Sequence, residues 1–524
     1  MSSPSRPNGV LSADIDVATA TPRNNPTLPK ATDDAPSNQG EQGIQIEAQT
    51  ENSKSNVELD RGVVAWEGPD DAENPKNWPD SKKWGHVTIL SILTILTPLG
   101  SSMFAPGIPA ILEEFHERSD TMATFMMSVY FLGFALGPLV VAPLSEIYGR
   151  RPLYLYGNIL FVIFTICTAV SNSIGMLMAF RLLMGLTGCV PVTIGSGSIA
   201  DIMPAEKRGR AMSAWALGPL LGPCVGPVAG GVLIEALNWR WVYWIISILG
   251  TTVFPLNFLF LQETFSQVFL DKRAKALRKV AGNLDSQNQL PSLDNPRPSI
   301  QKAIMRPLQL LLRAPVVTVS AIYIAIVYGI MNLLITTFSF VYPDTYGFGE
   351  AESGLAFLPG GLGMVIGVLL FGQLTDLVVL RHKARETTYK PEVRLVPQLT
   401  IPSSLALPIG LLLYGWATAG HIHWIIPMIG VSIFTIGMMG ITACLQSYLL
   451  DTHLQYAASV TAALTVLRSL LGAFLPLGGL QMYNALGLGW GNSLLAFISL
   501  ILFPIPLILY LLGERIRNTF RISL

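Results

Sequence analysis

The sequence predicts an all-α integral membrane protein whose 12 transmembrane helices form two related six-helix bundles, with both termini in the cytoplasm. Only 13% of the 524 residues are charged and 51% are hydrophobic, whereas soluble domains carry about 25% charged residues. Apolar stretches of roughly 20 residues, long enough to cross the hydrocarbon of a bilayer, recur along the chain. This composition excludes a soluble enzyme.

The predicted spans fall into two groups of six. They cover residues 84–106, 121–142, 152–171, 174–200, 211–237 and 241–261, and then 316–341, 354–376, 395–416, 424–449, 457–482 and 490–512. The implied domains are a disordered cytoplasmic tail (1–80), an N-terminal bundle (81–261), a cytoplasmic central loop (262–315), a C-terminal bundle (316–512) and a cytoplasmic tail (513–524). The first tail is rich in Ser, Pro, Asn, Asp and Gln, which is typical of disorder.

The distribution of Lys and Arg predicts the orientation. With a cytoplasmic N-terminus, all 34 of these residues fall in cytoplasmic segments except Arg118 and Arg240 outside and Arg181 and Arg468 within helices. Positive charge is enriched on the cytoplasmic side of membrane proteins. The totals of 34 basic and 34 acidic residues balance, so no global basic field indicates nucleic-acid binding.

Two flanking segments are expected to touch the membrane surface. Trp78 and Trp84 lie beside lysines, a pattern typical of interfacial anchors. The basic run Asp271–Lys279 of the central loop predicts an amphipathic helix on the anionic leaflet. A partner-binding tail and a regulatory site in the loop remain alternatives.

Two short loops at equivalent places of the two halves carry the first motif. The first, Ala142-Pro-Leu-Ser-Glu-Ile-Tyr-Gly-Arg-Arg-Pro152, packs an acid and two arginines into a small-residue turn. The second reads Gly372-Gln-Leu-Thr-Asp376 and is followed by Arg381. Charge pairs in such loops can hold neighbouring helix ends and break when the halves rock. A weak internal repeat of this kind is expected of transporters built from related halves.

The first loop resembles the Gly-x-Leu-x-Asp-Arg-x-Gly-Arg-Arg signature of the major facilitator superfamily. Ala142, Glu146 and Ile147 replace the first Gly, the Asp and the first Arg of that signature. The variant is similar to that of fungal 12-helix drug:proton antiporters, a multidrug and toxin efflux family, and the resemblance covers about residues 74–515. It implies the major facilitator fold and gating roles for Leu144, Glu146, Gly149, Arg150, Arg151, Gly372 and Asp376.

The fifth predicted helix carries a stripe of small residues. Its members recur mostly every four residues, at Gly218, Gly222, Gly226, Pro227, Gly230 and Gly231. Such a stripe lets two helices approach closely in lipid, and the prolines favour bending. A tight packing face and a pliable hinge are both compatible with it. The run resembles the antiporter signature of the superfamily, which implies export rather than uptake.

Arg181 lies within the fourth predicted helix, where an unpaired charge is costly, so it should face the bundle interior. The resemblance implies that Arg181 takes part in proton coupling, and Asp201, which closes the same helix, is a further candidate. A structural hydrogen bond is the alternative for Arg181. The acid that carries the proton is not identified, because the candidate acids lie near helix ends.

Substrate contacts are expected from the middle of helices 1, 4, 7 and 10, by analogy with other transporters of this architecture. The candidates are polar or aromatic side chains: Ser101, Phe104, Tyr328, Asn332, Phe434 and Arg468. An aromatic, weakly polar lining would suit bulky apolar or weakly cationic compounds. Ordinary helix packing is equally compatible with each position.

The sequence contains no phosphate-binding loop of the Gly-x-x-x-x-Gly-Lys-Ser/Thr type, which argues against ATP-driven transport. No metal cluster is suggested, so no cofactor is expected beyond a proton gradient. The predicted function is therefore a plasma-membrane antiporter, not an enzyme, that acts as a monomer and exports drugs, toxins or secondary metabolites in exchange for protons. Export of an organic acid, a non-transporting nutrient sensor and a vacuolar location remain alternatives.

Overall fold

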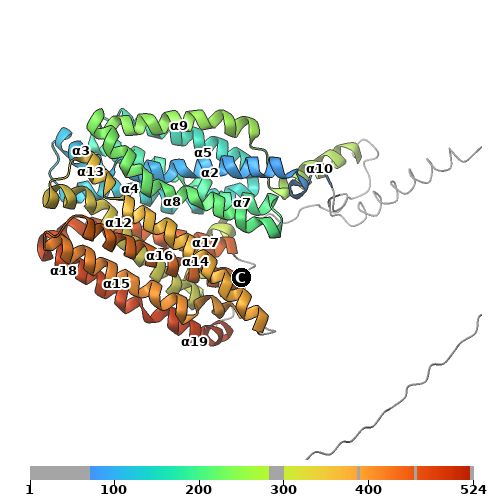
Figure 1. Cartoon of the computed structure of the whole chain (residues 1–524). Helices are drawn as coiled ribbons and strands as arrows, with labels where there is room; N and C mark the ends of the chain where they lie inside the picture. The colour runs from blue at the N-terminus through green and yellow to red at the C-terminus, as the bar shows by residue number, and fades with distance from the viewer. Residues whose placement is uncertain (1–65, 67–70, 282–299, 386–389, 454–456, 520–524) are drawn as a thin grey trace, which may run out of the picture. The chain divides into compact units, whose positions relative to one another are not determined.

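The computed structural model describes residues 66, 71–281, 300–385, 390–453 and 457–519, and every regular element among them is a helix. The first bundle contains α2 (Asp80–Ser102), α3 (Ile108–Glu114), α4 (Asp120–Tyr148), α5 (Arg150–Ala169), α6 (Ile174–Gly188), α7 (Val190–Ile202), α8 (Ala205–Ala236) and α9 (Trp239–Phe260). The second contains α12 (Pro315–Tyr346), α13 (Glu350–Leu355), α14 (Leu358–Arg385), α15 (Pro397–Ala419), α16 (Ile425–Thr452), α17 (Ala457–Phe474), α18 (Gly479–Leu502) and α19 (Pro504–Thr519). Figure 1 colours the first bundle blue to green and the second yellow to red.

These helices make twelve crossings. Eleven segments of the described chain are long and apolar enough to span a membrane, and the last of them, Ser459–Thr519, has 61 residues. A helix of that length would reach roughly 90 Å, about three times the hydrocarbon thickness. It turns back at Gly487, whose φ of 74° favours glycine. The segment therefore crosses twice, and the predicted all-α fold of two six-helix bundles is confirmed.

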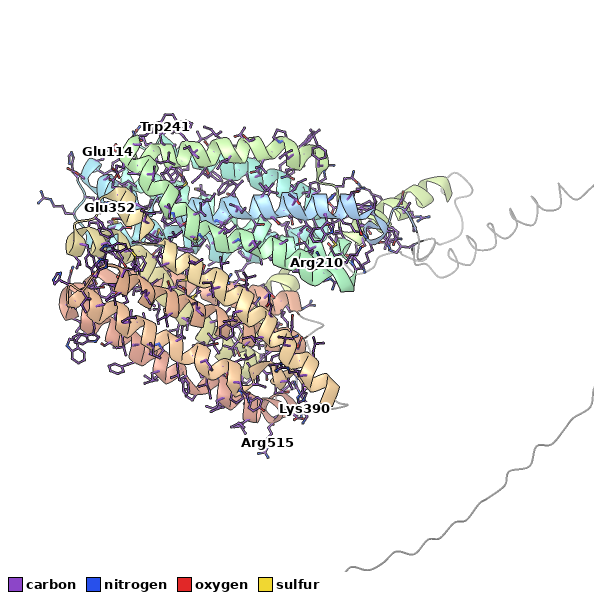
Figure 2. The ribbon with its side chains drawn as sticks, in the orientation of Figure 1. Glu114, Arg210, Trp241, Glu352, Lys390 and Arg515 are labelled. Atoms are coloured by element: carbon purple, nitrogen blue, oxygen red, sulfur yellow. The ribbon has the colours of Figure 1, made fainter. Side chains whose placement is uncertain are left out.

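Charged side chains mark the two ends of the bundles. In Figure 2, Arg210, Lys390 and Arg515 lie at one end, whereas Glu114, Trp241 and Glu352 lie at the other. We call the first the basic end and the second the opposite end. Figure 2 thus agrees with the unequal Lys and Arg distribution in the sequence, which places most cations on one side.

The glycine stripe of α8 is a packing face against α2. A Cβ atom at Gly218 would contact Thr94, one at Gly222 would contact Pro98, and one at Gly230 would contact the Met103 carbonyl. At Gly226, the added atom would lie 2.5 Å from Ser102 Oγ, which itself donates a hydrogen bond to the Gly222 carbonyl at 3.2 Å. Helix α8 is continuous through its three prolines. Of the two interpretations of the stripe, a tight packing face and a pliable hinge, the structure shows the packing face.

A second face of α8 touches the other bundle. A Cβ atom at Gly231 would contact the Glu350 carbonyl, and one at Gly354 would contact the Pro227 carbonyl. Further along, Gly361 of α14 packs against Cys224. Small residues on both sides allow this close approach, so α8 is packed simultaneously against its own bundle and against the second bundle.

The segment before α2 packs on protein. Trp78 is 8% exposed, its ring lies 5.0 Å from the His86 ring, and Lys82 Nζ lies 3.9 Å from its centroid. The expectation of a lipid anchor is therefore wrong for Trp78, because Trp78 folds back onto α2. Trp84 is only partly buried.

The central loop contributes two described helices, α10 (Ser266–Ala281) and α11 (Ile300–Arg313). An ion pair of 3.1 Å between Arg273 and Asp71 joins α10 to the segment before α2. The predicted membrane contact of this loop stays a prediction. Residues 1–65 of the predicted tail, 282–299 of the loop and 520–524 lie outside the described part of the chain.

The close α8–α2 contact predicts the effect of a single methyl group. Gly230→Ala places Cβ against the Met103 carbonyl and should destabilise the protein by about 1–3 kcal/mol, the usual cost of overpacking. Gly85→Ala on α2, where nothing lies within 4 Å of the added atom, is the control and should leave the stability unchanged or raise it by up to about 1 kcal/mol, because Ala is favoured over Gly in a helix. Thermal unfolding of the two purified variants measures both effects. Equal midpoints would show that the two helices do not pack tightly at this position.

Candidate substrate site and gates

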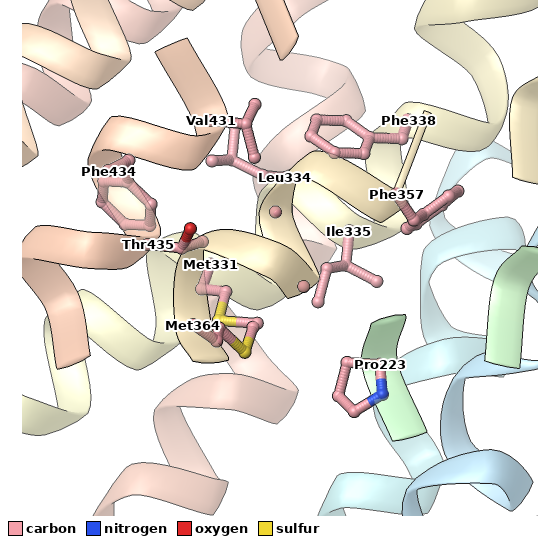
Figure 3. A pocket seen from close by; sticks show the side chains of 12 residues that line it. Pro223, Met331, Leu334, Ile335, Phe338, Phe357, Met364, Val431, Phe434 and Thr435 are labelled. Carbon is pink, nitrogen blue, oxygen red and sulfur yellow. The ribbon is translucent and has the colours of Figure 1, made fainter. Parts of the chain in front are cut away.

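An apolar pocket lies where α8 of the first bundle meets three helices of the second. Side chains and glycines of α8, α12, α14 and α16, together with Phe357 between α13 and α14, surround a small space of about 20 Å³ that is partly open to solvent. Its lining residues are Pro223, Met331, Leu334, Ile335, Phe338, Phe357, Gly360, Gly361, Met364, Val431, Phe434 and Thr435. Figure 3 shows Pro223 as the labelled contribution of the first bundle, facing Ile335, with Met331 and Met364 side by side. The lining is apolar and partly aromatic, and the space has room for about one water molecule, so a larger ligand has to displace the flexible Met331 and Met364 side chains.

Glycines of α14 shape the wall of this pocket. A Cβ atom at Gly360 would lie 3.1 Å from Val431, and one at Gly367 would lie 2.7 Å from Met439 Cβ. At Gly363 the added atom would contact Thr435. These positions bring α14 close to α16, while Gly361 brings it close to α8. Two methionines then fill the remaining space with flexible side chains, which adapt readily to ligands of different shape.

The six candidate substrate residues separate into three groups. Phe434 lines the pocket. Tyr328, Asn332 and Arg468 gather where α12 meets α17, with the Arg468 guanidinium 5.0 Å from the Tyr328 ring centroid. Ser101 and Phe104 lie elsewhere, in the cluster around Arg181. These two are not pocket residues, because each is occupied by a contact within the first bundle.

Arg181 is fully buried, and its guanidinium is satisfied by neutral groups. Its Nε donates to the Met126 carbonyl at 2.8 Å and one terminal nitrogen donates to the Tyr243 hydroxyl at 2.9 Å. The other terminal nitrogen donates to the Ser101 carbonyl at 3.5 Å, and the guanidinium lies 3.6 Å from the Phe104 ring centroid. Arg181 therefore joins α2, α4 and α9 to α6, and its described partners include no acid.

At the basic end of the first bundle, a carboxylate holds the start of α5. The Arg150 and Arg151 N–H groups donate to Glu263 at 2.9 and 3.1 Å, which matches the preference of helix N-termini for negative charge. Gly149, with φ of 93°, permits this turn, and any Cβ there would collide with the Glu263 carboxylate. Arg150 Nε also pairs with Asp201 at 3.4 Å.

The second bundle repeats this arrangement. Arg394, which precedes α15, pairs with Asp451 at the end of α16 at 3.0 Å and with Asp376 of α14 at 2.9 Å. Arg150 is the first residue of α5 and pairs with Asp201 at the end of α7. Each pair thus joins the start of the third crossing of a bundle to the end of the fourth. The ion pairs described at the basic end either connect groups of one bundle or, for Arg273–Asp71, join the central loop to the segment before α2.

The remaining gating candidates make fewer contacts. Glu146 is exposed and takes part in none of the described polar contacts. The acids that contact Arg150 and Arg151 are Asp201 and Glu263 instead. Leu144 is partly buried, and Gly372 is exposed, with nothing within 4 Å of the place that a Cβ atom would take. Arg151 donates to the Phe258 carbonyl at 3.0 Å.

The described polar contacts between the bundles run from the middle to the opposite end. Ser339 Oγ donates to the Ala105 carbonyl at 2.7 Å, and Gln481 Nε2 donates to Thr121 Oγ1 at 3.1 Å. The Ala351 N–H donates to the Glu235 carboxylate at 3.2 Å. The bundles are therefore tied together at the opposite end.

Several of these residues escaped sequence reasoning. Glu263, Arg394 and Asp451 were not assigned to the gates, because their partners are distant in the sequence and no local motif joins them. Met331 and Met364 carry no signal that separates a pocket residue from an ordinary core residue. The periodic glycines of α14 were a usable signal, since they resemble the stripe recognised in α8.

The contrast between the two intramembrane arginines predicts different effects on stability. Arg181→Ala leaves buried acceptors without donors, each at a cost of about 1–3 kcal/mol, and should lower the thermal midpoint clearly. Arg468→Ala removes only a described ring contact and should change the midpoint little. Unfolding of both variants in one detergent tests this. An unchanged midpoint for Arg181→Ala would mean that the Arg181 cluster does not hold the first bundle together.

Known proteins with similar sequences and structures agree with this architecture. The chain is 46% identical over 463 residues to the efflux pump radE of Floropilus chiversii, covering 88% of this chain and 86% of that protein. It is 45% identical over 462 residues to the MFS-type transporter tndD of Aspergillus flavipes, covering 87% and 86% of the two chains.

Solved transporter structures share the fold at low sequence identity. A D-xylose–proton symporter aligns with a TM-score of 0.58 and 12% identity over 79% of this chain and 97% of that one. A bacterial homologue of the human lysosomal transporter Spinster aligns with a TM-score of 0.57 and 16% identity, over 85% and 100%. Residues 90–476 match the profile of the Major Facilitator Superfamily. The two-bundle fold, the sequence relatives and this match together establish that the chain is a membrane transporter of the major facilitator superfamily.

Proposed function

We propose that this transporter exports a fungal secondary metabolite or a toxic organic compound across the plasma membrane, in exchange for protons. The observation that carries the proposal is the apolar pocket between the bundles. Its lining comes from both bundles of one chain, which supports a monomer as the working unit. The names of relatives such as the efflux pump radE support the direction of transport.

The contacts between the bundles support an alternating-access cycle. We take the basic end as cytoplasmic because it carries most Lys and Arg. The bundles are hydrogen-bonded to each other at the opposite, extracellular end, whereas the cytoplasmic ion pairs stay within each bundle. A substrate would enter the pocket from the cytoplasm, and rocking of the bundles would then break the extracellular contacts and release it outside.

The Arg150–Asp201 pair is the proposed site of proton coupling. Protonation of Asp201 would remove its attraction to Arg150, which starts α5. Arg181 would act indirectly, since its neutral partners hold three helices of the same bundle. Protonation of Asp201 could thereby shift the equilibrium between the inward-open and outward-open conformations, although the proton does not bind in the pocket.

Efflux from a pump-deficient yeast strain tests the proposal. Cells expressing the full chain are loaded with a panel of aromatic dyes, antifungals and organic acids, and export is measured with and without a protonophore. The wild type should export at least one class, and the protonophore should stop it. Met364→Trp, which fills the pocket, should reduce export at least about fivefold at equal surface level, because overpacking costs about 1–3 kcal/mol. Leu362→Trp on the same helix is the control, since Leu362 is 55% exposed.

Three outcomes would contradict parts of this account. Protein at the cell surface that exports nothing from the panel would oppose the exporter proposal and favour a sensor. Export that is indifferent to the protonophore would oppose proton exchange. Equal loss of export in both tryptophan variants would show that the loss does not come from filling the pocket, and would oppose the pocket as the substrate site.

A further inference from the structure

The interiors of the membrane spans carry an unbalanced charge. Every Asp and Glu lies at or beyond an end of the twelve predicted spans, so the only charges inside them are the two cations Arg181 and Arg468. A charge inside a membrane protein normally has a partner. Arg181 finds neutral acceptors on three helices, but the surroundings of Arg468 differ.

Arg468 lacks comparable partners. Its Nε is buried without a hydrogen-bond acceptor, and no ion pair joins the side chain to a described acid. Its described contact is with the Tyr328 ring, 5.0 Å from the guanidinium. The side chain is nevertheless partly exposed. Its two terminal nitrogens make none of the described hydrogen bonds or ion pairs.

The position of Arg468 on α17 directs it toward the pocket side. Gly472, one turn further along the same face, packs against Tyr328 and Asn332 of α12. Phe474, which is 55% exposed, lies on a different face of α17. On α12, Tyr328, Met331 and Ile335 follow the i, i+3, i+7 spacing of one helix face, and the latter two line the pocket. Tyr328, the ring that the Arg468 guanidinium contacts, therefore lies about one helical turn from the pocket residue Met331.

We propose that Arg468 binds an anionic group of the substrate, a carboxylate or an ionised phenol, while the apolar ring system of the same molecule displaces the Met331 and Met364 side chains and occupies the pocket. This inference rests on the proposed export function and names its substrate class as amphiphilic aromatic acids. A planar guanidinium forms strong paired hydrogen bonds with a carboxylate. A bound anion would also balance the positive charge of Arg468 inside the membrane span. An inside-negative membrane potential drives anions outward, so export of this class is favoured energetically.

Binding to the purified full-length protein in lipid nanodiscs tests the assignment. The probes are anthracene-9-carboxylate, naphthalene-2-carboxylate and biphenyl-4-carboxylate, each compared with its uncharged methyl ester. Wild-type protein should bind at least one acid more tightly than its ester. Arg468→Gln should lower the affinity for that acid by about 10- to 100-fold, the range expected for a charged hydrogen bond. The affinity for the ester should stay unchanged. Arg468→Lys should be intermediate, because it keeps the charge but loses the paired geometry.

Arg515→Gln, at an exposed position of the basic end, controls for the change in net charge and should bind acids as the wild type does. Equal weakening of acid and ester in Arg468→Gln would overturn the inference, because Arg468 would then act through the fold. Failure of every acid to bind more tightly than its ester would overturn it as well. Export of uncharged compounds in the yeast assay would in that case leave the export function standing.

Discussion

The close backbone approach of α8 to helices of both bundles is the constraint on which the rest of the structure depends. Lipid offers no hydrophobic force between helices, so their association relies on packing and on small residues that let backbones meet. Gly222 and Gly230 bring α8 against α2, while Gly231 meets the second bundle at Glu350. One helix is thus fixed in its own bundle and placed against the other. The pocket forms where Pro223 of α8 faces α12 and α14.

Charged residues at the ends of the bundles and charged residues inside the spans have different partners. Ion pairs at the basic end hold each bundle internally, and the Arg150–Asp201 pair has its counterpart in Arg394–Asp451. The equivalence of these pairs supports an origin of the two bundles from one repeated unit. Within the spans, Arg181 is satisfied by neutral acceptors. Each bundle can therefore move as a body, because the described polar contacts inside it far outnumber those that cross between the bundles, such as the ones at Ser339, Ala351 and Gln481.

Much of the fold could be predicted from the sequence because hydrocarbon imposes a simple requirement on length and polarity. The count of twelve crossings follows from it, and the four-residue spacing in α8 predicted a packing face that the structure contains. The site was harder to predict. Phe434 lines the pocket, but Ser101 and Phe104 belong to the Arg181 cluster. The sequence indicates how deep a residue lies in the membrane, but not which neighbouring helix its side chain contacts. Partners such as Arg394 and Asp451 are 57 residues apart and meet only after the bundle has assembled.

The most direct test of alternating access is a cross-link between the bundles at the opposite end. Thr121 and Gln481 are hydrogen-bonded across the two bundles, so cysteines at these positions can be joined by a short bis-methanethiosulfonate cross-linker, which reduction removes. The account predicts that the cross-linked protein still binds substrate from the basic end, exports none, and recovers export after reduction. Full export by the cross-linked protein would contradict the account, because substrate would then leave without separation of the bundles at this end.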